Sequence, residues 1–205
     1  MPPRIADAET RREQISRAAI EVFARDGFQG AAVSDIATAA GLSKGSIYRY
    51  FDDKEALFHA AFAAVQKQLL HDCTTAIDAQ ERAWDKLTAG VTVSVEALQR
   101  HIALYPLTLE FWAAASAGPA RERLGAVMAG MYGEFRELVM TLLRQGQAEG
   151  DLDRTLDVEA TAAWLVGSLD GLLLQHWFDP AVDPRASAAS LLSILRQGMA
   201  KAPET

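Results

Sequence analysis

The chain has few of the features that would place it outside the cytoplasm. It holds one cysteine, Cys73, so no disulfide bond can form within it. No apolar run reaches the roughly 18 residues that a membrane-spanning helix needs. The N-terminal stretch MPPRIADAETRREQ lacks the apolar segment of a secretory signal. We therefore expect a soluble, cytoplasmic protein that does not enter a membrane.

Motifs for metal binding are also absent. The histidines are His59, His71, His101 and His176, and none belongs to an H-E-x-x-H pair or to a cysteine–histidine cluster. We expect no metal site and no cofactor. We also expect Cys73 to fill an apolar interior rather than to act as a redox sensor.

Negative charge is distributed unevenly along the chain. The 205 residues carry a net charge of −7. Residues 1–51 hold seven basic and six acidic side chains, a balance of +1, whereas residues 52–205 hold 13 and 21, a balance of −8. Phosphate binding needs Lys and Arg. The acidity therefore belongs to the C-terminal part and does not argue against nucleic-acid binding by the N-terminal part.

Apolar residues recur at helical spacing along almost the whole chain, and no strand-like alternation extends beyond a few residues. Between Ile15 and Phe23, five apolar residues share one face of a helix. Thr10 and Glu13 form a capping box predicted to start this helix, and Gly27 is predicted to end it. The fold class is predicted to be all-α with nine helices. The others are expected over about 34–40, 44–50, 52–78, 82–103, 106–117, 120–148, 157–178 and 185–199.

The stretch AAGLSKGSIYRYFDDKEAL, residues 39–57, predicts a helix-turn-helix. Two short helices that cross closely need a small residue inside the first one, and Ala37 supplies it. The chain must then leave that helix with positive φ, which Gly41 allows. The buried faces are predicted to hold five apolar or partly apolar residues: Ile36, Ala40, Leu42, Ile47 and Tyr50.

The polar residues of the second short helix are predicted to point outward, so that this helix can enter the major groove of DNA. Lys44 is the expected base reader, at O6 and N7 of guanine. Gly45 allows close backbone approach, and the Tyr48 hydroxyl faces phosphate. Arg49 is assigned to a base or a phosphate. The predicted DNA-binding residues are Ser34, Ser43, Lys44, Gly45, Ser46, Tyr48, Arg49 and Lys54.

The long helix that follows is predicted to begin at a second capping box, formed by Asp52 and Glu55. Lys54 lies in its first turn. Its ammonium group and the free N–H groups of that turn are expected to hold a phosphate together.

These residues resemble the DNA-binding domain of the TetR family of transcriptional regulators. The resemblance covers about Ile15 to Leu57 and is carried by A…FARDGF, DIATAAGLSKGSIYRYF and DKEALF. One position departs from the family: Ala31-Ala32 stands where the family usually has Ser or Thr as helix cap and phosphate contact. Ser34 or Asp35 is the expected substitute for that cap.

The resemblance implies a homodimer that binds double-stranded DNA through an N-terminal three-helix head. It also implies that a small molecule releases the DNA. The corresponding domains are residues 1–52 for DNA binding and residues 53–205 for ligand binding and dimerisation.

The ligand and dimer sites are expected in this C-terminal domain. Its aromatic residues are core packing or pocket wall, and we expect some of them to line a cavity for a mainly apolar effector. The expected pocket residues are Trp84, His101, Trp112, Met131, Phe135 and Trp164. Gly167 and Gly171 lie one turn apart and indicate either a tolerant helix or a close helix–helix approach. The expected interface residues are Gly167, Gly171, Leu174, Leu191 and Leu195.

We expect a DNA-binding repressor rather than an enzyme. The alternative is an all-α ligand carrier or enzyme with an incidental helix-turn-helix, in which Glu110, Asp170 and His176 would be the catalytic candidates. A third reading is an architectural DNA binder without a ligand. The size of the C-terminal domain argues against that reading, because dimerisation alone needs fewer residues.

Overall fold

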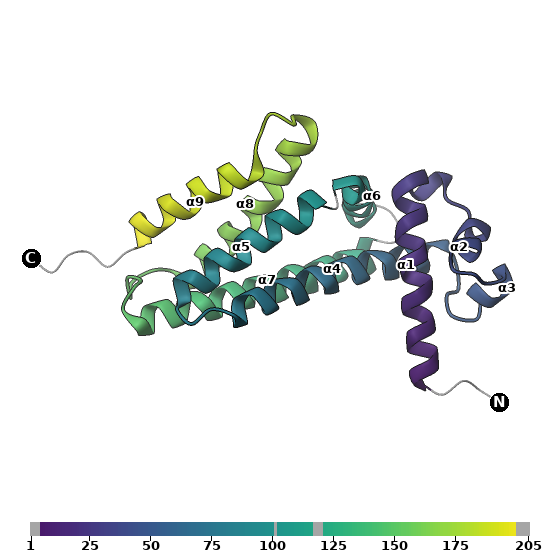
Figure 1. Ribbon diagram of the computed structural model, residues 1–205, viewed down its shortest axis with the longest axis horizontal. Helices are drawn as coiled ribbons and strands as arrows, with labels where there is room; N and C mark the ends of the chain where they lie inside the picture. Colours follow the sequence, from purple (N-terminus) through teal and green to yellow (C-terminus); the bar gives the residue numbers. More distant parts are fainter. Residues whose placement is uncertain (1–4, 101, 117–120, 200–205) are drawn as a thin grey trace, which may run out of the picture. The chain divides into compact units, whose positions relative to one another are not determined.

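The computed structural model describes residues 5–100, 102–116 and 121–199. All regular elements within these ranges are helices, and the predicted all-α class with nine α-helices is confirmed (Figure 1). The α-helices are α1 (Ile5–Gly30), α2 (Val33–Ala39), α3 (Lys44–Ile47), α4 (Lys54–Asp78), α5 (Ala83–Arg100), α6 (Tyr105–Ser116), α7 (Arg121–Glu149), α8 (Val158–Phe178) and α9 (Pro184–Met199), and a 3₁₀ turn, η1 (Ile102–Leu104), precedes α6.

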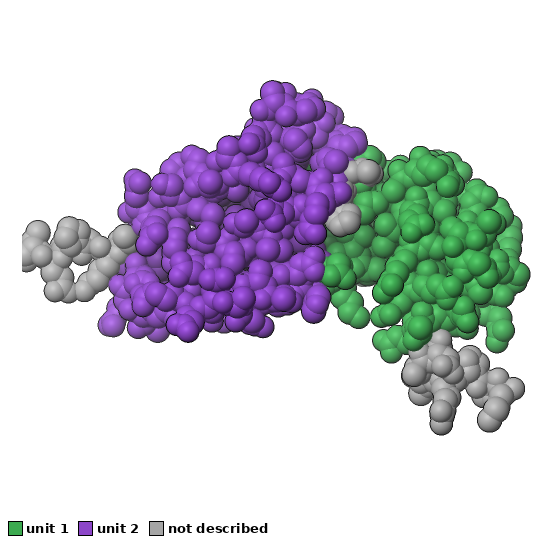
Figure 2. Space-filling view, viewed as in Figure 1, with its two compact units in different colours: residues 1–68, 103–124 green, residues 69–102, 125–205 purple. Residues whose placement is uncertain are grey.

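The chain divides into two compact units, coloured separately in Figure 2. Unit 1 consists of Met1–Gln68 and Ala103–Leu124, and unit 2 of Leu69–Ile102 and Gly125–Thr205. Unit 1 therefore contains α6 in addition to the first three helices and the start of α4. The functional boundary between residues 52 and 53 stays a prediction, because compactness does not say which residues carry which function.

Both predicted capping boxes were wrong in position. Helix α1 begins at Ile5, so Thr10 lies inside the helix; the segment IADAE is rich in good helix formers and extends it. Helix α4 begins at Lys54, and its cap is Asp53 instead of Asp52: the Asp53 carboxylate accepts the Ala56 N–H at 2.7 Å. Asp52 and Asp53 are adjacent, and the capping-box pattern with Glu55 selected Asp52 although Asp53 is the residue that caps the helix.

The predicted interruption at Gly27 is confirmed. Gly27 has φ +69° and ψ 172°, which breaks the helical path three residues before α1 ends at Gly30. An L-residue with a side chain rarely adopts positive φ, so glycine is required by the backbone here.

Each unit has its own apolar core. In unit 1 the fully buried side chains include Ile15, Phe23, Ile36, Ile47 and Leu57. The unit 2 core contains Ile77, Leu87, Leu142, Leu143, Leu152 and Leu165. None of the described helices combines the length and the apolar character that a membrane span requires.

Candidate nucleic-acid interface and effector domain

The turn between α2 and α3 has the geometry that the sequence predicted. Gly41 has φ +66°, which confirms the left-handed glycine. The Gly41 N–H donates to the Thr38 carbonyl at 3.0 Å, and the Leu42 N–H donates to the Ala37 carbonyl at 2.8 Å. This pair of bonds is a Schellman motif, in which an αL residue ends a helix and satisfies its last carbonyls. The chain is thereby redirected into α3 within four residues.

The inward face of the motif is apolar, as predicted. Ile36 and Ile47 have no exposed surface, and Ala37 and Ala40 are buried. Leu42 and Tyr50 are half-buried at the edge of this face. The burial fixes the rotation of α2 and α3 about their axes, because turning either helix would expose its isoleucine to water.

The outward face carries the side chains expected to meet DNA. Lys44, Tyr48 and Arg49 are exposed, Tyr48 by 46%. Within the described part of the chain, these three side chains make no hydrogen bond and no ion pair. Ser34, at the start of α2, is exposed as well. These groups can bind a ligand without first breaking a contact inside the protein.

Two serines of the predicted set have a structural role in α3. Ser43 is its N-cap, and its hydroxyl accepts the Ser46 N–H at 3.2 Å. The two hydroxyls also lie 2.8 Å apart, within hydrogen-bond distance. Gly45, between them, is helical with open space at its Cβ position. Both serines were expected to contact DNA, and the cap that Ser43 provides was not predicted.

Helix α2 begins without a side-chain cap. Its N-cap is Ala32, and no side chain accepts a hydrogen bond there, so neither Ser34 nor Asp35 replaces the hydroxyl that the family usually carries. Two of its first N–H groups, those of Asp35 and Ile36, instead donate to the Ala32 carbonyl at 3.0 and 3.2 Å.

Side chains from α1 hold the motif at two points, at the end of α2 and after the end of α3. The Gln14 amide donates to the Ala40 carbonyl at 2.8 Å, where α2 ends. The Arg12 guanidinium donates to the Tyr50 carbonyl and lies 4.4 Å from the ring centroid of Phe51. An isolated helix of four residues is unstable in water. The position of α3 therefore depends on these ties and on the buried face.

Lys54 is engaged inside unit 1. Its ammonium group donates to the carbonyls of Ala31 at 3.1 Å and Gln29 at 3.3 Å, and it lies 4.7 Å from the centroid of the Phe28 ring. The ammonium thus ties the start of α4 to the end of α1. Of its three N–H groups at least one remains for a phosphate, so the predicted phosphate contact stays a prediction.

Helix α6 is attached to α1 by the carboxylate of Glu110, which the enzyme alternative made a catalytic candidate. Glu110 accepts the Phe28 backbone N–H at 2.9 Å, directly after the break at Gly27. Its other oxygen lies 3.5 Å from the position that a Cβ atom at Gly27 would occupy. The carboxylate satisfies a donor that the broken helix leaves without an intrahelical partner.

An aromatic cluster packs beside this contact. Phe111 of α6 stacks on Phe62 of α4, with ring centroids 4.0 Å apart and planes 7° apart, and lies 5.8 Å from Phe58. Phe58 also meets Phe23 and Phe28 of α1. Unit 1 therefore joins α1, α4 and α6 through one continuous aromatic core.

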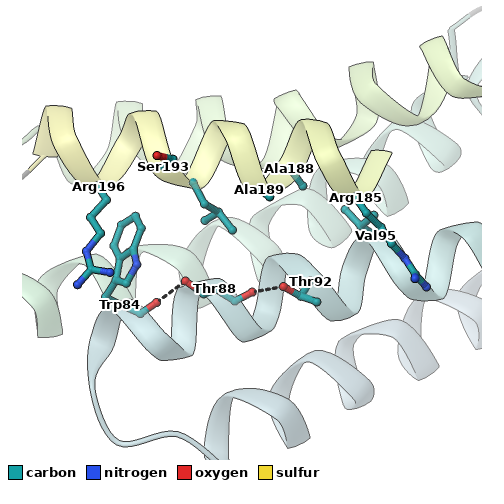
Figure 3. Close-up of a pocket in the computed structure, with 10 residues that line it drawn as sticks. Trp84, Thr88, Thr92, Val95, Arg185, Ala188, Ala189, Ser193 and Arg196 are labelled. Carbon is teal, nitrogen blue, oxygen red and sulfur yellow. Dashed lines mark hydrogen bonds between the residues drawn. The ribbon is translucent and has the colours of Figure 1, made fainter. Parts of the chain in front are cut away.

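A groove between α5 and α9 forms a cavity of about 460 Å³ in unit 2 (Figure 3). Trp84 lies at one end, where the Arg196 guanidinium approaches its ring centroid to 5.7 Å. The Thr88 hydroxyl donates to the Trp84 carbonyl at 2.9 Å. The lining residues are Trp84, Thr88, Thr92, Val95, Arg185, Ala188, Ala189, Leu192, Ser193 and Arg196. Of the expected pocket residues that the structure describes, Trp84 alone lines this groove.

The other expected pocket residues are dispersed. Met131 and Phe135 are half-buried on α7, whereas Trp164 of α8 is 53% exposed. Trp112 belongs to unit 1, and the others belong to unit 2. His101 lies outside the described residues. The grouping of these residues into one pocket stays a prediction.

Tyr132 of α7 and Asp170 of α8 form a polar pair that was not predicted from the sequence. The Tyr132 hydroxyl donates to the Asp170 carboxylate at 2.6 Å. Burial raises the pKa of Asp170 above its ordinary value, an effect that this hydrogen bond partly opposes. Asp170 had been considered only as a catalytic candidate, with Glu110 and His176. The His176 ring nitrogen instead meets the Val182 carbonyl at 2.8 Å.

The expected dimer residues fall into two groups. Gly167 and Gly171 face open space, since a Cβ atom at either would meet no atom within 4 Å. Leu191 and Leu195 are half-buried against the unit 2 core, and Leu174 is half-buried on α8. Large exposed apolar side chains lie on both helices: Trp164 (53%) and Phe178 (75%) on α8, with the glycines, and Ile194 (63%) on α9.

Cys73 is buried, as expected for an apolar filler, with its sulfur 3.2 Å from the Ser94 hydroxyl. Burial raises the pKa of its thiol, which disfavours the reactive thiolate. Among the residues that the structure describes, no three or more His, Cys, Asp and Glu side chains gather as metal ligands would.

Comparison with known proteins finds relatives over most of the chain. Residues 15–61 match the model of bacterial regulatory proteins of the tetR family, and residues 83–200 match the C-terminal domain of BetI-type transcriptional repressors. The chain is 28% identical to the transcriptional repressor KstR2 of Rhodococcus jostii over 195 residues, which are 93% of this chain and 91% of that protein.

Two solved structures extend the similarity to three dimensions. A transcriptional regulator of Pseudomonas aeruginosa PAO1 is 32% identical, with a TM-score of 0.75 over 93% of this chain and 90% of that one. The regulator FadR of Bacillus subtilis, solved with stearoyl-CoA, is 26% identical, with a TM-score of 0.74 over 91% of this chain and 98% of that one.

Proposed function

This chain belongs to the TetR family and is a DNA-binding regulator of transcription, and from that premise we propose that it is a homodimeric repressor released from a palindromic operator by a small, mainly apolar effector. We assign it a regulatory function rather than a catalytic one, because the relatives described above are transcriptional regulators. Its place of action is the cytoplasm, where the operator lies.

One observation carries the DNA-binding assignment: Lys44 projects from α3, and Tyr48 and Arg49 project from the residues directly after it, while α1 side chains hold the chain at the end of α2 and after α3. Lys44 reads a guanine and Tyr48 contacts phosphate. In a symmetric dimer the two α3 helices would occupy successive major grooves, about 34–36 Å apart, and would therefore require a palindromic site.

The test is a gel-shift titration on an operator selected from genomic DNA fragments. Lys44→Ala and Tyr48→Phe should weaken operator binding without loss of helicity. For Lys44 the loss should be about 1–3 kcal/mol, with relaxed preference at one base per half-site. Lys67→Ala is the matched control, since it removes one exposed positive charge about 20 Å along α4 from Lys54. Unchanged affinity of both head variants would refute the assignment.

The exposed apolar surface of α8 and α9 supports dimerisation. Trp164 and Phe178 expose most of their surface, and Gly167 and Gly171 leave room for a close approach of another helix. Gly171→Arg should produce a folded monomer, because the protomer itself has space for the added side chain. An intact dimer of this variant in sedimentation would place Gly171 outside the interface.

The effector is proposed to bind the C-terminal domain and to favour a conformation in which the two heads no longer match the operator. A coupling of about 1–3 kcal/mol gives a 5- to 150-fold change in affinity. Helix α4 contributes residues to both compact units, so we assign the transmission to it. The stearoyl-CoA bound by FadR joins a long apolar acyl chain to a charged coenzyme A group, so it supports an apolar surface in the effector site and leaves the charge of the effector open.

Apolar ligands should quench tryptophan fluorescence, raise the melting temperature and release operator DNA in one concentration range. If a screen found that highly charged metabolites alone release the DNA, the apolar effector would be wrong while the DNA-binding assignment would stand.

A further inference from the structure

The contact between α5 and α9 is incompletely filled. It leaves the groove of about 460 Å³ shown in Figure 3, a volume within the range of small-molecule sites. Side chains of packed helices normally interlock at crystal-like density. Here both walls carry small residues where they line the groove: Thr88 and Thr92 on α5, and Ala188, Ala189 and Ser193 on α9. The space therefore follows from the residue types along the two helices.

The floor of the groove is apolar. Val95, Ala188 and Leu192 line it and are 1%, 4% and 8% exposed, and they belong to one buried cluster. The two threonine hydroxyls of α5 donate to carbonyls of their own helix, at 2.9 and 2.8 Å, so their hydrogens are already engaged. This part of the groove is suited to the apolar body of a ligand, because covering it removes apolar surface from water.

One end of the groove carries a positive charge that no described residue neutralises. Arg196 lines this end and makes neither a hydrogen bond nor an ion pair within the described part of the chain. Its contact with the Trp84 ring, at 5.7 Å, is a cation–π contact that leaves its N–H donors available. Ser193, one turn earlier on α9, also lines the groove, and its hydroxyl has no hydrogen-bond partner among the described residues.

The remaining charges near the groove are balanced. None of its described lining residues is Asp or Glu. Arg185, at the other end in Figure 3, lies 3.6 Å from the Glu96 carboxylate and donates to the Gln99 side chain at 3.0 Å. Residues 52–205 carry a balance of −8, so an anion is repelled over most of this domain. Of the two arginines that line the groove, Arg196 is therefore the one available to an anion.

The groove does not coincide with the surface proposed for dimerisation. None of the residues assigned above to the dimer interface lines it. The exposed Ile194 lies two residues before Arg196, and with 3.6 residues per turn the two side chains leave α9 on nearly opposite sides. The groove and Ile194 therefore use different sides of α9.

We propose that the groove between α5 and α9 binds an apolar monocarboxylate. The Arg196 guanidinium holds the carboxylate, because two of its N–H donors match two oxygens in geometry, and the Ser193 hydroxyl donates a further hydrogen bond. The apolar body of the ligand covers the floor. One guanidinium compensates one negative charge, so a monoanion fits an acidic domain better than a doubly charged phosphate. This ligand site goes beyond the repressor function and does not depend on it.

The test compares three probes that share one phenylbutyl skeleton: 4-phenylbutyrate, 4-phenylbutanol and 4-phenylbutylamine. Binding to the full-length protein is measured by calorimetry at neutral pH and low ionic strength. The carboxylate should bind about 10-fold more tightly than the alcohol, the lower end of the range for a hydrogen bond to a charged group, and the amine should bind least. The preference should shrink in about 1 M salt, because salt screens exposed charges.

Variants of Arg196 test the anchor. Arg196→Gln should abolish the preference for the carboxylate and keep the affinity for the alcohol. Arg196→Lys should retain part of the preference, because lysine keeps the charge and loses the paired donors. Arg154→Gln is the matched control, since it removes an exposed positive charge of unit 2 outside the groove and should change nothing.

A second pair of variants tests the location. Ala189→Phe should weaken binding of all three probes because the ring fills the groove, whereas Ala186→Phe, at an exposed position of α9 that does not line the groove, should not. Circular dichroism checks that each variant is folded. Equal binding of the three probes, no binding of any, a carboxylate preference that survives in Arg196→Gln, or unchanged binding to Ala189→Phe would overturn the proposal.

Discussion

The turn between α2 and α3 allows a direct measurement of backbone strain. Replacing Gly41 by Ala places a side chain at φ +66°, and an L-residue in the left-handed region costs about 1–2 kcal/mol. No atom lies within 4 Å of the new Cβ, so no steric term adds to this value. For a chain of this length, each kcal/mol corresponds to roughly 2–4 °C in melting temperature. The expected loss is therefore about 2–8 °C.

Gly45, four residues later, provides a control of opposite sign. Its Cβ position is equally open, but its φ is not positive, and it lies in α3. Alanine there should leave stability unchanged or raise it by up to about 1 kcal/mol, since alanine is the better helix former. Thermal unfolding at one fixed protein concentration measures both variants, because association shifts the apparent stability.

Operator affinity completes the comparison. Gly41→Ala should weaken DNA binding because relaxation of the strained turn moves Lys44. Gly45→Ala should weaken it without loss of stability, because a methyl group then separates the backbone from DNA. A Gly41→Ala protein as stable as the wild type, or a Gly45→Ala protein that is markedly destabilised, would refute this account of the turn.

Three further predictions concern the body of the protein. Glu110→Ala should destabilise it by about 1–3 kcal/mol in a urea titration because the Phe28 N–H loses its acceptor, and Glu110→Gln should cost less; equal midpoints would contradict this role. Gly146→Ala should lower the melting temperature, because its Cβ would lie 2.7 Å from Cδ1 of Leu152 in the core. The cost of overpacking, about 1–3 kcal/mol, exceeds the gain in helix propensity. A higher melting temperature would show that the core has room for the methyl group. Burial raises the pKa of Asp170, so the folded state holds this proton more tightly than the unfolded chain and loses stability as pH rises above the ordinary value of about 4. The stability of Asp170→Asn relative to the wild type should therefore increase between pH 4 and pH 7. A stability difference that stays constant over this range would contradict the shift.

The head of the protein could be predicted because its determinants are local. Ala37, Gly41 and Ile47 lie within 11 residues, and each position permits few residue types: a small one, one tolerant of positive φ, and an apolar one. The start of α2 was predicted wrongly in one respect: Ala32 has no hydroxyl to offer, as the sequence shows, but the expected substitute, Ser34 or Asp35, does not cap the helix. Helix starts were less certain, because the capping-box pattern also fits residues inside a helix, as at Thr10.

The rest of the site depends on contacts that helical periodicity does not encode. The Glu110 carboxylate and the Phe28 N–H are 82 residues apart in sequence, and Tyr132 and Asp170 are 38 apart. The period of 3.6 residues identifies which side of each helix is apolar, but it does not say which two helices meet or at what register. A single polar residue between apolar neighbours gives the same sequence pattern whether its side chain faces water or a partner on another helix. The sequence therefore identifies the helix-turn-helix, which is nearly self-contained, whereas the polar contacts of Glu110 and Asp170 emerge only when distant helices are brought together.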